Sequence, residues 1–482
     1  MQQLSGLDAA FLAMETPAVY GHVGSVCVLD PSTCPEPLTL ERLQAVIASR
    51  LHLVPPFRRR LAEVPFGFDQ PYWIEDPDFD VEFHVRELSL PAPGDDKQLA
   101  EQAARLHARP LDRRRPLWEL YLISGLSGGR SAVYTKVHHA AIDGVSGNDI
   151  LAAVLDLTAE GRDLGPTPAW QSDPVPGPLP LLARSVLSLA GHPARAARLG
   201  AGFVRSTPAL LRSPSRPAIP VLDRLLPRRG ASAVLSQSGL RAPRTPFNKP
   251  VTPHRRWAFC TVPLSDVKAV KNAAGATVND VVMALCAGAL RRWLLDHDAL
   301  PDVPLVAAVP VSVRTAEQQG TGGNRVSTMT TAIPTNVASP AERLALCHEA
   351  MRVAKEQHGA LPANLLADVT QFAMPALAGQ AARMAARLRL VEWLSPFNLI
   401  ISNVPGPNLP LYYAGARLLA YYPLSAIADG PGLNITVISF EDGMHFGLIA
   451  CRELVPDLDL MAGYLVEELA ELLEATGGAV CA

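Results

Sequence analysis

The sequence predicts a mixed α/β protein built from two subdomains that are joined by an irregular segment. Residues 1–165 and 246–482 each combine strand-like and helix-like patterns, whereas residues 166–245 are dense in proline and arginine. At 482 residues the chain is long for one domain and comfortable for two, and its 48% of apolar residues can fill a large core. We therefore expect an N-terminal subdomain, a linker and a C-terminal subdomain with these boundaries.

The N-terminal part contains three clear patterns. Residues 21–30 (GHVGSVCVLD) form a mostly apolar run that predicts a strand. Residues 38–51 place apolar side chains on one helical face, which predicts a helix. Residues 131–139 (SAVYTKVHH) alternate in polarity and predict a second strand, followed by a helix over 148–157.

The C-terminal part repeats this mixture of elements. Residues 256–264 and 304–313 predict strands, and residues 276–297 predict a long helix with apolar side chains at spacings of three and four. Residues 434–450 predict a hairpin that is turned by Asp442-Gly443.

The linker is strongly basic although the whole chain is not. Residues 181–230 contain nine arginines, no lysine and one acid, Asp223, which gives a local charge of +8. A helix over 185–204 would carry Arg195 and Arg198 on its polar side. Two interpretations stand at this point: a solvated linker, or a surface that lies on the anionic head groups of a membrane or lipid droplet.

Composition excludes several classes of protein. A net charge of −3, from 43 basic and 46 acidic residues, argues against a nucleic-acid binder. Seven cysteines at irregular spacing, without a CxxC pair, favour neither a disulfide framework nor a zinc ribbon, and indicate a reducing compartment. The N-terminus lacks the pattern of a signal peptide, and no apolar run reaches the ~18 residues of a spanning helix. We expect a cytoplasmic protein that associates peripherally with the inner face of the membrane or with lipid inclusions.

The segment 136-KVHHAAIDGVSG-147 is the strongest candidate for a functional site. By strand alternation, His139 falls on the more apolar side and is predicted to point into the protein, whereas His138 is predicted to point away. Gly144 permits a tight turn after the strand, and Ser146 with Asp149 resembles a capping box that opens the next helix.

Three interpretations of the histidine pair compete. The first is a core histidine that is held by hydrogen bonds. The second, a metal site, is weak because adjacent strand residues point to opposite faces and no third ligand lies nearby at helical spacing. The third makes His139 a general base, since imidazole exchanges protons near neutral pH. Asp143 would then hold the loop, and because no nucleophile or GxSxG elbow is close in sequence, the base would deprotonate a hydroxyl of the substrate.

Several motifs together resemble one enzyme family. HHAAIDG (138–144) is similar to the HHxxxDG signature of the chloramphenicol-acetyltransferase-like superfamily, which includes peptide-synthetase condensation domains. RPLWEL (115–120), TVNDVV (277–282) and ISNVPGP (401–407) resemble elements of the bacterial wax ester synthase/diacylglycerol acyltransferase family, in its mycobacterial triacylglycerol-synthase-like form. One departure is ACR (450–452), where the family pattern places an acid before the arginine.

The resemblance implies a specific fold and reaction. The fold would be two facing α/β subdomains with an interface tunnel, open to acyl-CoA at one side and to an alcohol at the other. His139 would take the proton of the acceptor hydroxyl, which attacks the thioester without an acyl-enzyme intermediate. Acyl-CoA is then a co-substrate, and neither a bound cofactor nor a metal is expected; the glycine-rich GTGGNR (320–325) lacks the lysine of a nucleotide-binding loop.

The other motifs supply candidate supporting residues, which are Pro116, Leu117 and Trp118 as core or acyl-tunnel wall, Asn279 and Asp280 at a helix start, and Ser402 and Asn403 at a strand end. Asp280 is expected to be structural, with Thr277 as its N-cap partner, whereas Asn279 could orient His139 or the oxyanion. By analogy with the superfamily, Arg314 is the candidate partner of Asp143.

The predicted function is therefore transfer of a long acyl chain from acyl-CoA to a lipid alcohol. Diacylglycerol giving triacylglycerol is the first choice, and a fatty alcohol giving wax ester is the second. Two alternatives stay open: an acyltransferase for an exported complex lipid, and a lipid-surface binding protein without turnover. The intact histidine and aspartate of HHAAIDG argue against the last.

Overall fold

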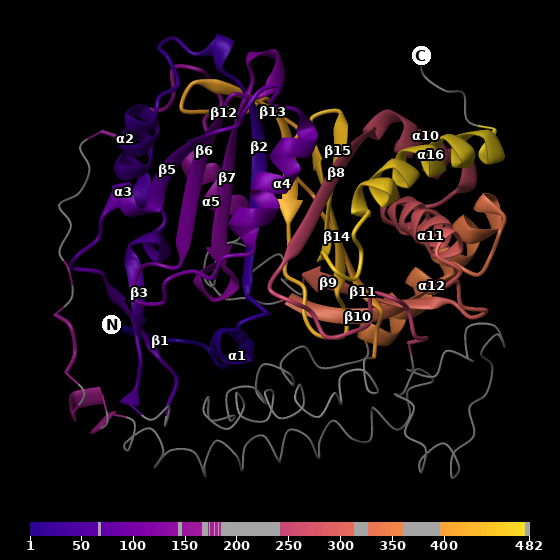
Figure 1. The fold of residues 1–482 in the computed structure, drawn as a ribbon, viewed down its shortest axis with the longest axis horizontal. Coiled ribbons are helices and arrows are strands. Elements are labelled where there is room, and N and C mark those ends of the chain that lie inside the picture. The colour runs from indigo at the N-terminus through magenta and orange to yellow at the C-terminus, as the bar shows by residue number, and fades with distance from the viewer. Residues whose placement is uncertain are drawn as a thin grey trace.

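A computed structural model describes most of the two predicted subdomains. The described residues are 1–65, 69–142, 147–165, 242–312, 326–359 and 396–477, with a few positions between 172 and 184. Two six-stranded sheets stand side by side in it, with helices packed against them (Figure 1). Most of the predicted linker, including the helix expected over 185–204, lies outside the described residues.

The N-terminal sheet takes two of its strands from the far end of the chain. Its strands, in spatial order, are β12 (Tyr412–Tyr413), β13 (Ala416–Leu424), β2 (His22–Asp30), β7 (Ser131–His138), β6 (Trp118–Ser124) and β5 (Val85–Ser89). All neighbours are antiparallel except β5 and β6. Because β13 crosses over to pair with β2, and β12 adds to the outer edge of β13, the division in space does not coincide with a division of the chain near residue 246 (Figure 1).

The C-terminal sheet is mixed. Its strands, in spatial order, are β10 (Val326–Ile333), β9 (Leu305–Ser312), β11 (Leu399–Val404), β14 (Leu433–Phe440), β15 (Gly443–Cys451) and β8 (Arg255–Pro263). The predicted hairpin is β14–β15, but its turn residues are Glu441 and Asp442. Phe440 pairs with Gly443, so the glycine begins the second strand and does not form part of the turn.

Shorter elements surround the N-terminal sheet. The helices of this part are α1 (Gly6–Met14), α2 (Leu40–Arg50), α3 (Val81–His84), α4 (Asp96–His107) and α5 (Gly147–Val154). Single 3₁₀ turns are η1 (Pro31–Thr33), η2 (Leu51–Leu53), η3 (Pro55–Arg58), η5 (Ser127–Gly129) and η6 (His139–Ile142). A small third sheet contains β1 (Gln2–Gln3), β4 (Tyr72–Glu75) and β3 (Arg59–Ala62).

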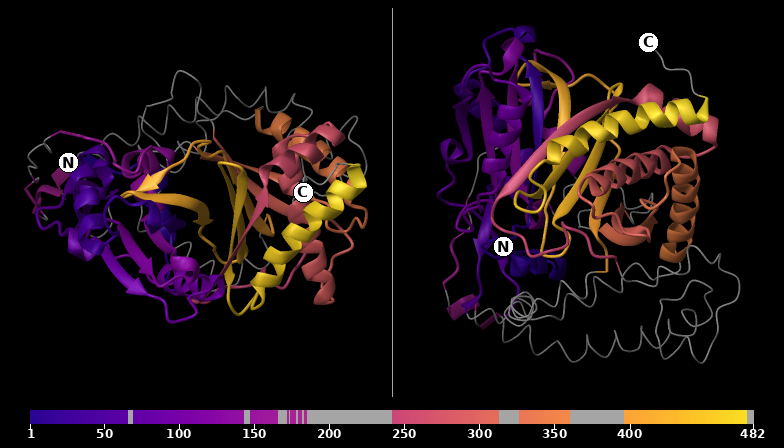
Figure 2. Two further views of the ribbon diagram at one scale, coloured as in Figure 1. Left: turned by 90° about the horizontal axis from the view of Figure 1, so that it is seen from above. Right: turned by 45° about the vertical axis from the view of Figure 1, so that its right-hand side comes forward.

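Four helices pack on one face of the C-terminal sheet, on the side away from the N-terminal sheet (Figure 2). They are α10 (Leu264–Ala274), α11 (Val278–Asp296), α12 (Pro340–Gly359) and α16 (Leu458–Thr476). No single helix of the described residues is long and apolar enough to cross a membrane. α10 and α11 meet that criterion when joined, but they are bent by 102° relative to each other.

Apolar side chains cover both faces of the N-terminal sheet. On one face, Val133 and Val137 of β7 pack with α2 and α5. On the other face, Tyr134 of β7 packs with α4 and with Trp257 and Ile449 of the C-terminal sheet. This second cluster joins the two subdomains, and β7 lies between the two layers.

Candidate active site

The histidine motif lies where β7 ends and a 3₁₀ turn begins. His138 is the last residue of β7, and His139 opens η6. The backbone N–H of His138 donates to Leu117 O at 2.9 Å, and that of His139 donates to Gly21 O at 2.8 Å. The main chain of both histidines is thus fixed by neighbouring strands and by the segment that precedes β2.

His138 is a buried histidine held by hydrogen bonds on both ring nitrogens. Its Nδ1 accepts the backbone N–H of Ala140 at 3.1 Å, so Nε2 is the protonated nitrogen and donates to Glu15 Oε1 at 3.1 Å. The residue is 2% exposed. The prediction that His138 points away from the protein is wrong, because alternation assigns residues to faces of a strand and here both faces are covered.

Glu15 is a residue of the site that the sequence analysis missed. Its Oε1 also accepts the N–H of Gly21 at 2.8 Å, and its Oε2 accepts Nη2 of Arg113 at 2.6 Å. Burial alone raises the pKa of Glu15, but the hydrogen bond and charge of His138, with the Gly21 N–H and Arg113, outweigh burial and lower the pKa to about 2. One sequence signal points to it: Glu15 is the only acid between Asp8 and Asp30.

His139 lies in the chain between two residues that line an apolar cavity, but its own side chain is not part of the lining. It is half-buried, and its ring stacks on Phe11 of α1 with a centroid distance of 4.3 Å and an interplanar angle of 23°. Val137 and Ile142, on either side of it in the chain, both line the cavity. Because His139 is partly exposed and does not line this cavity, its predicted inward direction stays a prediction.

The cavity lies inside the N-terminal subdomain, between its sheet and the helices α2 and α5. The empty space within the cavity and at its mouth, open solvent included, is about 640 Å³. The lining residues are Val23, Gly24, Ser25, Cys27, Ile47, Phe57, Leu120, Thr135, Val137, Ile142, Ile150, Leu151, Val154, Tyr413 and Tyr421. Such a lining, apolar with a few hydroxyl groups, is typical of a site for an apolar ligand.

The buried charges near β7 lie on its other face, toward the C-terminal subdomain. Lys136 is fully buried and pairs with Glu119 at 3.2 Å, while its ammonium donates to two backbone carbonyls. Burial, and then the charge of Lys136, lower the pKa of His107 to about 3, and burial lowers the pKa of His22 well below its usual value. These neutral histidines belong to the packing between the subdomains, where Nε2 of His22 donates to His107 O at 2.7 Å.

The structure brings two of the predicted supporting residues together. Nδ2 of Asn403, at the end of β11, donates to Oδ1 of Asn279, in the first turn of α11, at 3.3 Å. Asp280 forms a capping box with Thr277, the predicted N-cap residue, and accepts from His348 Nδ1 at 2.7 Å. Burial raises the pKa of Asp280, but the hydrogen bonds from His348 and Thr277 outweigh it, and the pKa is lowered.

Other predicted residues do not meet at the cavity or lie outside the described part. Pro116, Leu117 and Trp118 are buried and do not line the cavity. Trp118 stacks on Phe57 with a centroid distance of 4.6 Å, and Phe57 does line the cavity. Ser402 is half-buried on β11. Asp143, Gly144 and Arg314 lie outside the described residues, so the predicted pairing of Asp143 with Arg314 stays a prediction.

Metal ligation finds no candidate in the part of the chain that the structure describes. No group of three or more His, Cys, Asp or Glu side chains there is placed to hold an ion. The six described cysteines carry free thiols, and most are buried.

Two sheets joined by a shared apolar layer, with a histidine pair at the end of a central strand and a cavity beside it, define a protein of the chloramphenicol-acetyltransferase-like fold. The fold is also that of the first condensation domain of the CDA synthetase, which superimposes with a TM-score of 0.54 at 19% identity over all of this chain and 97% of that domain.

Comparison with protein-family models gives a finer assignment. Residues 4–282 match the wax ester synthase/diacylglycerol acyltransferase catalytic domain, and residues 322–473 match the WS/DGAT C-terminal domain. The solved wax ester synthase/diacylglycerol acyltransferase of Marinobacter aquaeolei VT8 is 31% identical, with a TM-score of 0.67 over 99% of this chain and 100% of that one. The chain belongs to this family and is an acyltransferase.

Curated relatives agree with this assignment. A Mycobacterium tuberculosis protein that carries the provisional name diacylglycerol O-acyltransferase is 38% identical over 99% of this chain and 91% of its own length. A second from that species, named in the same provisional way and as tgs2, is 37% identical over 98% of both chains. Diacylglycerol O-acyltransferase is thus the activity that the names of these similar proteins give.

Proposed function

We propose that the protein transfers a long acyl chain from acyl-CoA to diacylglycerol and so forms triacylglycerol. The observation that carries the proposal is that Val137 and Ile142, which precede and follow His139 in the chain, both line an apolar cavity. The names of the mycobacterial relatives favour diacylglycerol as acceptor. The name of the Marinobacter protein includes wax ester synthase, so a fatty alcohol is the second candidate acceptor.

The apolar wall of the cavity is long enough to contact an acyl chain. The strand register places Val23 opposite Val137 near the histidines, and Cys27 lies four residues farther along β2. At about 3.4 Å per residue this separation is about 13 Å. Three bonds of an extended chain span a similar length, so this stretch of the cavity wall matches roughly eleven carbon–carbon bonds of an acyl chain.

His139 is the proposed general base. It takes the proton of the acceptor hydroxyl as the oxygen attacks the thioester carbonyl, and a tetrahedral oxyanion forms. The intermediate then expels the CoA thiolate, which receives the proton from His139, so the side chain ends as it began. Proton transfer by a positioned group contributes typically 10²–10⁴-fold to the rate.

The oxyanion requires a preorganised donor, and Asn279 is the proposed one. Its amide oxygen points toward Asn403, so its Nδ2 group points the other way. It also lies in the first turn of α11, where the helix dipole favours negative charge. Asp143 and Arg314 are proposed to hold the loop after His139, and residues 181–230 are proposed to dock on an anionic membrane or lipid-inclusion surface at the cytoplasmic side.

The test is thiol release from palmitoyl-CoA by purified protein, with diacylglycerol, hexadecanol or no acceptor. We expect release that depends on diacylglycerol, and loss of at least about 10²-fold in His139→Ala. His297→Ala is the matched control, because His297 caps the far end of α11, about 28 Å from its first turn. Release with hexadecanol alone would favour the wax ester reaction. Unchanged turnover in His139→Ala would reject the general-base role.

A further inference from the structure

The segment that fixes the histidine motif has a second attachment, on the opposite subdomain. We call residues 15–21, between α1 and β2, the Glu15 loop. At its ends it holds His138 through Glu15, and the backbone of His139 through Gly21. Its tip is closed by paired backbone hydrogen bonds between Thr16 and Val19, at 3.0 and 3.3 Å. The loop is thus a small rigid unit, and what holds its tip also affects its ends.

Arg255, the first residue of β8 in the C-terminal sheet, holds that tip. Its Nη2 donates to Ala18 O at 2.5 Å, and its guanidinium lies over the ring of Tyr20 at 5.5 Å. Tyr20 in turn stacks on His22 with a centroid distance of 5.4 Å, and His22 pairs with His138 across β2 and β7. Arg255 is therefore connected to the histidine motif in two ways, through the backbone of the Glu15 loop and through the stacked rings of Tyr20 and His22.

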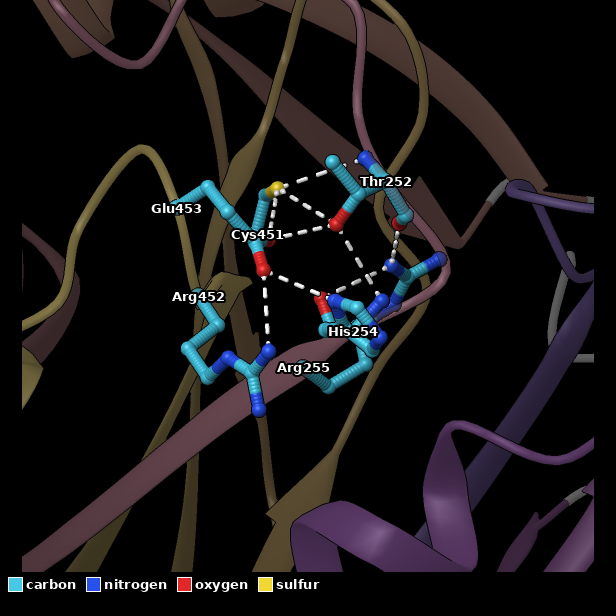
Figure 3. A network of polar contacts seen from close by, with 6 residues as sticks. All are labelled: Thr252, His254, Arg255, Cys451, Arg452 and Glu453. Atoms are coloured by element: carbon cyan, nitrogen blue, oxygen red, sulfur yellow. Dashed lines mark hydrogen bonds and ion pairs between the residues drawn. The ribbon is translucent and has the colours of Figure 1, made fainter.

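Arg255 is itself anchored in a polar corner of the C-terminal subdomain (Figure 3). Its Nη1 donates to Thr252 O at 2.5 Å and to His254 O at 3.2 Å. Glu453 accepts from Thr252 Oγ1 at 2.5 Å and from His254 Nδ1 at 2.7 Å. The N–H of Thr252 donates to Sγ of Cys451 at 3.4 Å. Position 451, where the family pattern places an acid, is a cysteine, and Glu453 two residues later supplies the carboxylate of this polar corner.

The chemistry of these contacts suits a guanidinium and not an ammonium. Arg255 is 6% exposed, and among the described residues no carboxylate lies within ion-pair distance of it. Its hydrogen bonds go to carbonyls of two subdomains, Ala18 on one side and Thr252 on the other. A planar fork with fixed donors can span both carbonyls, whereas a lysine is a single point charge.

We propose that Arg255 is a positioning residue for acyl transfer. By joining the C-terminal subdomain to the tip of the Glu15 loop, it keeps the backbone of His139 at the cavity and in register with groups that the other subdomain contributes. The role in catalysis rests on the proposed general-base function of His139. The role in holding the loop does not.

The experiment compares Arg255→Ala and Arg255→Lys with Arg256→Ala. Arg256 is the matched control, because alternate residues of a strand point to opposite faces, and the neighbours Trp257 and Ala258 pack in different clusters. We expect kcat of Arg255→Ala to fall about 10–100-fold, because small misplacements of catalytic groups lower the rate by this order of magnitude. KM for palmitoyl-CoA should stay within about threefold of the wild-type value. Arg255→Lys should recover part of this loss, and Arg256→Ala should resemble the wild type.

Amide hydrogen exchange gives a readout that does not depend on activity. The N–H of His139 and that of Gly21 are both bonded within this assembly, so their exchange should become at least about tenfold faster in Arg255→Ala and remain unchanged in Arg256→Ala. If Arg255→Ala fails to fold, Arg255→Lys decides, through the same two amides. Wild-type exchange and wild-type kcat in a folded Arg255 variant would overturn the proposal. Altered exchange in a protein without transferase activity would instead reject the proposed function and keep the attachment.

Discussion

Replacement of Glu15 by glutamine tests whether the histidine motif is held by a buried charge. The carboxylate of Glu15 is bonded to His138, Gly21 and Arg113, and its pKa is lowered from 4.5 to about 2. Each pKa unit corresponds to about 1.4 kcal/mol, so the charged form contributes on the order of 3 kcal/mol to the free energy of unfolding at neutral pH. Glutamine keeps the shape of the side chain but removes this contribution.

The pH dependence gives the sign of the effect. Because the pKa is lower in the folded state, the contribution is fully present above the ordinary pKa of 4.5 and is lost as the pH falls toward 2. The difference in unfolding free energy between wild type and Glu15→Gln should therefore shrink from about 3 kcal/mol at pH 7 to about 1.4 kcal/mol at pH 3.

Urea unfolding at pH 7, 4 and 3 measures this difference directly. Glu63→Gln is the control, since Glu63 is exposed and surface substitutions of this kind stay within about 0.5 kcal/mol. Acyl transfer should also fall in Glu15→Gln, because the Gly21 backbone that accepts the His139 N–H loses its own anchor. A Glu15→Gln protein as stable as the wild type at pH 7, or a difference that does not change with pH, would refute this reasoning.

Three further substitutions test the packing around the site. In Gly288→Ala, the new Cβ would lie 2.0 Å from the carboxyl group of Glu468 and should break its buried ion pair with Arg343, at a cost of about 3–5 kcal/mol in urea unfolding. The control Gly463→Ala, whose Cβ enters open space, should gain about 0.5–1 kcal/mol, and equal effects of the two substitutions would contradict the close packing of Gly288 on Glu468. Asp156→Ala, which removes the carboxylate partner of the buried Arg50, should lower the free energy of unfolding by a similar ~3–5 kcal/mol. A loss below about 1 kcal/mol would show that this ion pair is not needed for stability. Cys27→Phe should exclude about three methylene groups from the cavity and lower kcat/KM for palmitoyl-CoA about 60-fold relative to decanoyl-CoA; an unchanged ratio would place the acyl chain elsewhere.

Most of the secondary structure could be predicted because its signals are local. The helix expected over 276–297 is α11, the strand expected over 21–30 is β2, and the strand expected over 304–313 is β9. Each combines a sustained apolar pattern with a recognisable end, such as the Thr277 cap of α11. The turn of the β14–β15 hairpin was displaced by one residue, because a glycine after an acid suits both the second turn position and the start of the next strand.

Features that depend on contacts between distant residues could not be predicted. β13 lies between the C-terminal strands β11 and β14 in the chain but pairs with β2, nearly 400 residues earlier, and no local pattern specifies that partner. Glu15 and His138 are 123 positions apart, so their hydrogen bond had no signal beyond an isolated acid near the N-terminus. The family resemblance identified the histidines and the fold, but it did not assign which residues hold them.

The two adjacent histidines differ in their surroundings because β7 ends at His138 and η6 begins at His139. His138 is still in the strand, and its ring fills a site in which Glu15 and the Ala140 N–H satisfy both nitrogens. The bond to Ala140 closes the first turn of η6, and Glu15 fixes Gly21, which receives the His139 N–H. The main chain on both sides of the His139 side chain is therefore determined by His138 and its partners. The general base proposed at His139 would need a fixed backbone to reach a substrate oxygen to within a few tenths of an ångström, and the contacts of His138 provide that backbone.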